Sequence, residues 1–204
     1  MGIYSSIKRV FDVVSSAIVL LVLSPAFLII AISIKLDSKG PVIYKQMRVG
    51  KDNCNFYLYK FRSMRVDSDK YGLITVGDKD SRITKVGYFI RKYKLDEFPQ
   101  LINVIKGNMS IVGPRPVVRS VVELYTPEQM EVLSVRPGLT DPATILYRNE
   151  SEILASVEDP EQYYRTVIMP NKLKLSINYL HNASMVQDIK LIWLTLSKVF
   201  IRYE

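Results

Sequence analysis

Two adjacent carboxylates in a basic neighbourhood form the densest chemical signal in this sequence. Asp96 and Glu97 lie in the segment KLDEFPQLINVIKGNMSIVGPRP, residues 94–116, and several Lys and Arg residues precede them. In one interpretation Asp96 caps a helix, Glu97 complements its dipole, and neither residue takes part in chemistry. In the other, the helix N-terminus and the cations hold phosphate groups while a carboxylate binds Mg²⁺ or attacks phosphorus. A capping Asp can also react, so the residues alone leave both interpretations open.

An arginine between two prolines ends the same segment, in the run Gly113-Pro114-Arg115-Pro116. Because each proline ring fixes its own φ, this backbone can present the Arg115 guanidinium to a phosphate at low entropic cost. The alternative is an ordinary turn that carries a solvated arginine.

The composition excludes several other kinds of site. The chain has 204 residues with one Cys and one His, which rules out an intramolecular disulfide, a Cys/His zinc site and an iron–sulfur cluster. Its 28 basic residues against 20 acidic ones give a net charge of +8. This excess predicts attraction to polyanions such as nucleic acid, anionic lipid or phosphorylated substrates.

A candidate membrane segment lies near the N-terminus. Residues 13–34 contain no charged residue, and a helix needs roughly 20 apolar residues to cross a bilayer. Ser24-Pro25 falls in the middle, where the proline removes a backbone hydrogen bond and favours a kink. Basic residues flank both sides of the run: Lys8 and Arg9, then Lys35 and Lys39. The residues leave two arrangements open, a kinked spanning helix and a helix-break-helix hairpin that returns to the same face.

The elements that must position the candidate residues follow residue 40. Two aromatic and β-branched runs, PVIYKQMRVG and NFYLYKFRSM, flank the polar KDNC and predict a β-hairpin. Residues 65–80 lack periodicity and form a candidate substrate-covering loop. Apolar residues at three- and four-residue spacing from Ile83 to Tyr93 predict an amphipathic helix, and a second helix is expected to begin at Asp96, with Pro99 in its first turn.

Two further helices are indicated in the second half of the chain. Thr126 and Gln129 have the spacing of a capping box. The apolar side that runs from Met185 to Val199 belongs to a terminal helix that either packs on the domain or lies in the lipid interface.

Together these features resemble the bacterial sugar transferase family, the monotopic phosphoglycosyl transferases. The resemblance rests on the basic flank, the membrane segment interrupted by Ser-Pro, and the motifs YKFRSM, LDEFPQLINVIKGNMSIVGPRP and VRPGLT, and it covers about residues 7–140. It implies a mostly helical α+β fold in a monotopic membrane protein, with an N-terminal re-entrant helix-break-helix and a small β-hairpin. We expect residues 1–39 to form the membrane-associated helix and residues 40–204 to form a cytoplasmic catalytic domain with interfacial helices.

The resemblance also implies a reaction. Family members transfer a sugar-1-phosphate from a UDP-sugar to a polyprenol (undecaprenyl) phosphate, release UMP and so initiate glycoconjugate synthesis. We therefore expect this chain at the cytoplasmic face of the bacterial inner membrane, with membrane lipids, the UDP-sugar donor and the polyprenol phosphate acceptor as partners.

The family's functional residues map onto motif positions of this chain. The nucleophile maps to Asp96 and the Mg²⁺-binding carboxylate to Glu97, with Asp96 as a second candidate metal ligand. The arginine of the GPRP motif maps to Arg115 as a phosphate ligand. The further mapped residues are the helix break at Ser24 and Pro25 and the basic positions expected around the diphosphate, Lys60, Arg62 and Arg91.

Two alternatives from other classes remain at this stage. A basic membrane-anchored binding protein for anionic partners would use exposed aromatic residues among cations, as Tyr57, Tyr59 and Phe61 in the hairpin could supply. A Mg²⁺-dependent membrane phosphatase would use the same carboxylates without a lipid acceptor. We favour the transferase and expect no nucleic-acid partner. The sugar is left open, since PGLTDP departs from the family's usual PGxTG. The oligomeric state is left open as well.

Overall fold

The computed structural model describes residues 2–66, 68 and 80–200, with side chains as far as residue 198. Most of the expected substrate-covering loop therefore lies outside the described residues. The described part is mostly helical, with two sheets of two strands each, which confirms the expected α+β class. The helices are α1 (Ile3–Asp37), α2 (Lys85–Lys92), α3 (Gln100–Lys106), α4 (Arg119–Val122), α5 (Pro142–Leu146), α6 (Glu150–Ala155), α7 (Pro160–Tyr163), α8 (Met169–His181) and α9 (Met185–Phe200). The strands are β1 (Ile43–Val49), β2 (Asn55–Phe61), β3 (Ser110–Val112) and β4 (Gly138–Thr140).

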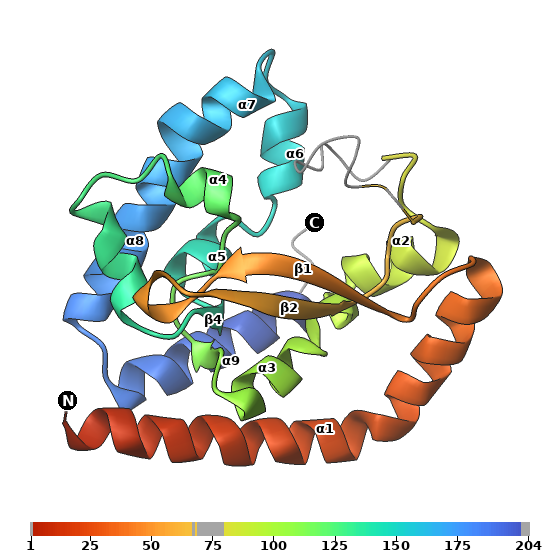
Figure 1. The fold of residues 1–204 in the computed structure, drawn as a ribbon, viewed down its shortest axis with the longest axis horizontal. Helices are drawn as coiled ribbons and strands as arrows, with labels where there is room; N and C mark the ends of the chain where they lie inside the picture. The colour runs from red at the N-terminus through yellow and green to blue at the C-terminus, as the bar shows by residue number, and fades with distance from the viewer. Residues whose placement is uncertain (1, 67, 69–79, 201–204) are drawn as a thin grey trace.

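Helix α1 is long, apolar and bent, and it runs along one side of the molecule (Figure 1). The expected break does not interrupt the helix, because the chain stays helical from Ile3 to Asp37 with Pro25 inside it. A proline at position 25 cannot donate to the Leu21 carbonyl one turn earlier. The Ser24 hydroxyl donates to that carbonyl instead, at 2.8 Å. Ser-Pro therefore permits a bend without leaving the freed carbonyl unpaired.

Much of the apolar surface of α1 is left uncovered by the part of the chain that the structure describes. Among its residues only Asp12, Ser16 and Ile34 are buried, while Leu21 is 76% exposed. By length and composition α1 is the one helix in the described part of the chain that could cross a membrane. A surface of this kind is stable only against lipid or another apolar partner.

Both ends of α1 are bonded to the rest of the domain. Near its start, the Lys8 ammonium lies 2.7 Å from Oδ2 of the buried Asp188 in α9. The Arg9 guanidinium donates to the carbonyls of Val104 and Ile105 at the end of α3, at 2.7 and 3.1 Å. At the other end, Oδ2 of Asp37 accepts from the backbone N–H of Val86 in α2 at 3.0 Å.

The predicted hairpin is confirmed, with β1 and β2 antiparallel and Tyr44 opposite Lys60. Residues opposite each other share a face, so the face with Lys60 also carries Gln46 and Arg48 of β1. The exposed edge of β2 is held by Asn103 of α3. Its side chain accepts from the Tyr59 N–H at 3.0 Å and donates to the Tyr57 carbonyl at 2.7 Å. This pairing fixes β2 beside α3 and so beside the segment that carries Asp96 and Glu97.

The GPRP loop is positioned by a short parallel pair, β3 with β4. Ser110 lies opposite Gly138 and Val112 opposite Thr140, and the Gly113 N–H donates to the Thr140 carbonyl at 2.9 Å. A Cβ on Gly138 would lie 2.2 Å from the Gly113 nitrogen, so this approach requires glycine. The backbone that enters Pro114 and Arg115 is thereby fixed against the PGLT segment.

The C-terminal helices complete the domain. The expected capping box forms between Thr126 and Gln129, although the turn it begins is a 3₁₀ helix, Gln129–Ser134. Helix α9 packs on the domain, which is one of the two arrangements expected for the terminal helix, because Leu191 is buried in the core; Trp193 on another side of the helix is 67% exposed. The exposed apolar residues of α9 form one stripe: Val186, Ile189, Trp193 and Leu196.

Replacing Asn103 should weaken the fold. Asn103→Ala leaves the Tyr59 N–H and the Tyr57 carbonyl unpaired, and we expect a loss of about 2–3 kcal/mol. At roughly 2–4 °C per kcal/mol for a chain of this size, the melting temperature in detergent should fall by several degrees. The matched control is Asn149→Ala, since Asn149 is exposed and its side chain forms no cap. Equal melting temperatures for Asn103→Ala and wild type would contradict this role.

Candidate active site

A 3₁₀ turn, Leu95–Glu97, carries the two carboxylates. It follows Lys94, whose backbone is left-handed at φ 55°, and it links α2 to α3. The expectation that Asp96 caps the following helix is wrong, because α3 begins at Gln100 with Pro99 as its N-cap. Asp96 lies a turn earlier. Its environment is therefore set by burial and neighbouring side chains rather than by the end of a helix.

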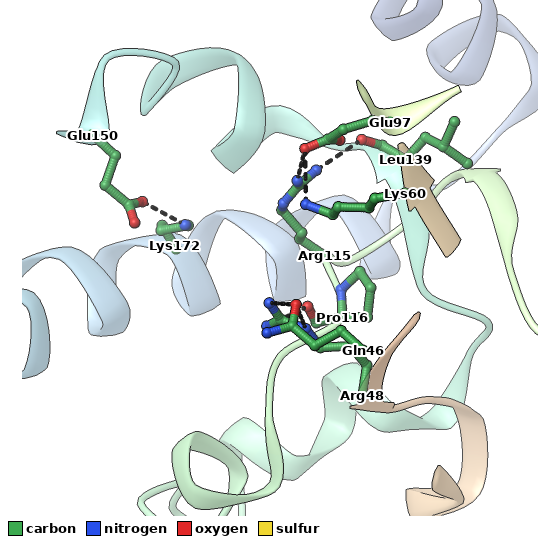
Figure 2. A network of polar contacts seen from close by, with 9 residues as sticks. All are labelled: Gln46, Arg48, Lys60, Glu97, Arg115, Pro116, Leu139, Glu150 and Lys172. Atoms are coloured by element: carbon green, nitrogen blue, oxygen red, sulfur yellow. Dashed lines mark hydrogen bonds and ion pairs between the residues drawn. The ribbon is translucent and has the colours of Figure 1, made fainter. Parts of the chain in front are cut away.

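Glu97 is the centre of an ion-pair cluster (Figure 2). Its Oε1 lies 3.4 Å from the Lys60 ammonium and also accepts from Nη2 of Arg115. Nη1 of Arg115 donates to the Leu139 carbonyl at 3.4 Å. Burial alone would raise the pKa of Glu97, but the charges of Arg115 and Lys60 outweigh it and hold that pKa well below its usual range. Glu97 is therefore a fixed negative charge at neutral pH.

Asp96 has the opposite environment. It is 6% exposed, and in the described part of the chain its carboxylate forms no hydrogen bond or ion pair. Burial, followed by the charge of Glu97, raises the pKa of Asp96, while Lys60, Arg91 and Lys94 oppose the rise. Adjacent carboxyl groups with opposite pKa shifts are typical of sites where two acids have different tasks. Asp96 retains unpaired oxygen lone pairs that could attack an electrophile or bind a metal.

Both carboxylates open on a cavity of about 900 Å³. The hairpin, α2, the 3₁₀ turn and the GPRP loop line one side, and α5, α6 and α8 line the other. Its basic lining residues are Arg48, Lys60, Arg91, Lys92, Lys94, Arg115, Arg148, Arg165, Lys172 and Lys198. A cavity of this size with so many cations can hold an elongated ligand that carries several negative charges.

The structure brings together five of the six residues expected around the reaction: Lys60, Arg91, Asp96, Glu97 and Arg115. Arg62 is the exception and does not line the cavity. It is 5% exposed, and its guanidinium donates to the carbonyls of Ile34 and Ser38 at 3.2 and 2.6 Å. The expectation that Arg62 contacts the diphosphate is corrected: Arg62 lies one residue beyond the end of β2, and its guanidinium is held at the C-terminal end of α1, whose carbonyls it caps.

Sequence reasoning did not select Arg48 and Gln46 of β1. Nε and Nη2 of Arg48 donate to Oε1 of Gln46 at 3.1 and 2.6 Å, and Arg48 lines the cavity. Burial, together with the charge of Arg115, lowers the pKa of Arg48 to about 10. The two-residue alternation of β1 was the available signal, because it places both residues on the face that carries Lys60.

The carboxylates of Asp96 and Glu97 fit Mg²⁺ if the phosphates of a bound substrate supply further oxygen atoms. Within the described residues no three His, Cys, Asp or Glu side chains gather into a metal-binding group, so the protein offers two carboxylates. Mg²⁺ is commonly held by one or two carboxylates plus substrate phosphates and water. The unpaired oxygens of Asp96 suit this role, whereas Glu97 would share its charge between the metal and its two cations.

Comparison with known proteins decides the family. The model of the bacterial sugar transferase family matches residues 3–202. The chain belongs to the bacterial sugar transferase family. This confirms the resemblance seen in the sequence, and the matched region includes the membrane helix and every residue of the Glu97 cluster.

Two of three similar relatives are named as transferases that act on undecaprenyl phosphate. A UDP-N-acetylgalactosamine-undecaprenyl-phosphate N-acetylgalactosaminephosphotransferase from Aeromonas hydrophila is 36% identical over 97% of this chain and 44% of its own length. A UDP-glucose:undecaprenyl-phosphate glucose-1-phosphate transferase from Escherichia coli K12 is 36% identical over 98% of this chain and 41% of its own. An exopolysaccharide production protein from Rhizobium leguminosarum bv. phaseoli is 38% identical, with 92% of both chains covered. The chain thus spans less than half the length of the first two relatives.

The burial of Asp96 predicts that its charge destabilises the fold. A carboxyl group whose pKa is raised on folding binds its proton more tightly in the folded state, so stability falls as pH rises through that range. Asp96→Asn should therefore raise the melting temperature at pH 7, and the gain should shrink as pH falls below the usual carboxyl range. Melting curves in EDTA, with the exposed Asp52→Asn as control, test this. A lower melting temperature for Asp96→Asn at pH 7 would be the opposite of the expected sign.

Proposed function

We propose that this protein transfers a sugar-1-phosphate from a UDP-sugar to a polyprenol phosphate and releases UMP. The observation that carries the proposal is a buried, unpaired Asp96 that faces a cation-lined cavity, in a domain joined to a long uncovered apolar helix. An aqueous nucleotide-sugar and a lipid-borne phosphate are the substrates that such a placement suits. The Aeromonas and Escherichia relatives are named for sugar-phosphate transfer of this kind.

The chemistry we propose has two half-reactions at one phosphorus. A carboxylate oxygen of Asp96 attacks the sugar-bearing phosphorus of the donor, the bond from that phosphorus to the bridging oxygen breaks, and the bridging oxygen leaves with UMP. A phosphate oxygen of the lipid then attacks the same phosphorus, and the bond to Asp96 breaks to restore the carboxylate. Lys60 and Arg115 balance the charge of Glu97 and of the incoming phosphates.

Covalent catalysis suits the electrostatics of this reaction. Direct attack would require two bulky anionic substrates to meet in line in one cavity, whereas an aspartyl-phosphosugar intermediate lets them react in turn. When bound, Mg²⁺ would neutralise diphosphate charge and polarise the phosphoryl oxygens. Asp96 and Glu97 would hold it together with phosphate oxygens.

We propose that α1 is re-entrant in the bacterial inner membrane, with the catalytic domain on the cytoplasmic face. A straight helix of its length would be about 50 Å long, and its ends would lie on opposite sides of a bilayer. The polar contacts of Lys8 and Arg9 at one end and of Asp37 at the other are made to one folded domain. The bend near Ser24 and Pro25 is compatible with both ends staying on the same side.

The two alternative functions receive no comparable support. A phosphatase would not need the apolar surface of α1 beside its active site, and the relatives named above are described as transferases or as exopolysaccharide production proteins. The hairpin face expected of a polyanion-binding protein is incomplete, since Phe61 is buried in the core at 5% exposure.

The nucleophile is tested by isotope exchange. In the absence of lipid, wild-type protein should exchange labelled UMP into the UDP-sugar, because the first half-reaction is reversible, and full kinetics should be ping-pong. Asp96→Asn should abolish the exchange, since an amide cannot form the intermediate, while membrane association is retained. Substantial turnover by Asp96→Asn, in material shown by mass spectrometry to be free of amide hydrolysis, would falsify the mechanism.

The metal is tested by chelation. Excess EDTA should stop UMP exchange, and added Mg²⁺ should restore it, because two carboxylates and several phosphate charges otherwise share only side-chain cations. The dependence on Mg²⁺ should be steeper in Glu97→Gln, which retains Asp96 alone as a carboxylate ligand. Full exchange in EDTA would show that the metal is not needed.

The membrane arrangement is tested by cysteine labelling in sealed cells and inverted vesicles. The exposed Cys54 of the hairpin reports the side of the domain. In a Cys54→Ser background, Ser6→Cys and Lys39→Cys should label from that same side, and Leu21→Cys should be protected by lipid. Labelling of positions 6 and 39 from opposite sides would establish a spanning helix.

A further inference from the structure

Arg48 is a cation in the cavity that has only neutral partners. Its guanidinium donates to the Gln46 amide oxygen, as described above, and Nη1 lies 3.5 Å from the Pro116 carbonyl. In the described part of the chain no carboxylate pairs with it. Arg115, in contrast, is bonded to Glu97.

Arg48 shares the cavity with a second arginine, Arg115, and this makes the lack of a carboxylate beside Arg48 relevant to anion binding. Both arginines line one cavity, and Arg48 lies beside Pro116, the residue that follows Arg115 in the GPRP loop (Figure 2). The charge of Arg115 lowers the pKa of Arg48, so the two guanidinium groups repel each other. Two cations that repel each other in one cavity, of which only one is neutralised, are stabilised when an anion binds near them.

The hydrogen bonds to Gln46 hold the Arg48 guanidinium in one orientation, so that Arg48 is preorganised to bind an anion. Both side chains lie on one face of β1, and a single amide oxygen accepts from Nε and from Nη2. These two hydrogen bonds fix the plane of the guanidinium, and because the amide is neutral they do not neutralise its positive charge. A planar guanidinium whose orientation is fixed suits bidentate contact with a phosphate.

We propose that Arg48, oriented by Gln46, binds a second phosphate group in this cavity, distinct from the phosphorus attacked by Asp96. The inference rests on the proposed function, in which the cavity receives two phosphate-bearing substrates. The second phosphate is supplied either by the nucleotide part of the donor or by the lipid acceptor. Arg48 binds the phosphate that Asp96 does not attack, while Arg115 and Lys60 stay with Glu97 at the phosphorus that Asp96 attacks.

The test changes the charge of Gln46 and leaves Arg48 in place. Gln46→Glu supplies Arg48 with a carboxylate of nearly the same shape, which competes with phosphate. Arg48→Gln removes the cation, and Arg48→Lys keeps the charge without the bidentate geometry. The matched control is Lys45→Gln, which removes a positive charge from the exposed face of the same strand.

Two kinetic arms identify the source of the phosphate. Lipid-free exchange of UMP into the UDP-sugar reports the donor, and product formation at varied polyprenol phosphate reports the acceptor. Gln46→Glu and Arg48→Gln should raise KM about tenfold or more in one arm, the strength expected of a charge-assisted hydrogen bond. Arg48→Lys should be intermediate, and Lys45→Gln should match wild type. A higher KM in the exchange arm assigns the nucleotide phosphate, and a higher KM in the second arm alone assigns the lipid phosphate.

Direct binding separates this inference from the proposed function. Titration with inorganic pyrophosphate should show weaker binding to Gln46→Glu and Arg48→Gln at unchanged melting temperature. Wild-type binding and wild-type KM in these variants would overturn the role of Arg48, as would a loss of kcat and stability at unchanged KM and unchanged pyrophosphate affinity. If the wild-type protein catalyses neither arm, the proposed function fails, and the pyrophosphate titration still decides whether Arg48 binds phosphate.

Discussion

The ion-pair cluster on Glu97 is the interaction on which the geometry of the site depends. One carboxylate binds Lys60 from β2 and Arg115 from the GPRP loop, so three segments distant in the sequence meet at a single charge. Asn103 fixes β2 to α3, and the glycines at 113 and 138 fix the GPRP loop to β4. Because both cations pair with Glu97, the neighbouring Asp96 is left buried without a partner among the described residues. The asymmetry between these two carboxyl groups follows from that distribution of charge.

The same cluster lies close to the membrane helix. The Phe27 ring of α1 lies 5.7 Å from the ring of Phe61 and 5.8 Å from the ring of Phe98, centroid to centroid. Phe98 follows Glu97 directly, and Phe61 follows Lys60. The aromatic contacts therefore join the segment just after the Ser-Pro bend to two of the three chain segments of the cluster. Insertion of α1 in lipid would place this reaction centre at the bilayer boundary, where a lipid phosphate group lies.

Local patterns predicted the elements and motif positions, and long-range contacts decided the rest. Alternation and turn residues were enough for the hairpin, and the spacing of apolar residues was enough for α2. The motifs gave the right group of residues for the cavity except for Arg62, whose role depends on where the end of α1 lies. Asp96 was misplaced as a helix cap because the 3₁₀ turn depends on the left-handed backbone at Lys94, which local composition does not reveal. Arg48 was passed over because its significance lies in having no paired carboxylate among the described residues, which the sequence does not reveal.

The two walls of the cavity differ in how much of their role the sequence can reveal. The wall with the hairpin, the 3₁₀ turn and the GPRP loop carries the motifs, and its charges suit any phosphate-bearing substrate. The opposite wall is built from α5, α6 and α8, where the Lys172 ammonium pairs with Glu150 at 2.6 Å and few motifs mark the chain. A phosphate centre is alike in every nucleotide-sugar, whereas hydroxyl and amide groups differ between sugars and are distinguished by shape and hydrogen bonds. Conserving the first wall while varying the second would therefore let one reaction serve different sugars, which is why the motifs indicate the chemistry here but not the sugar.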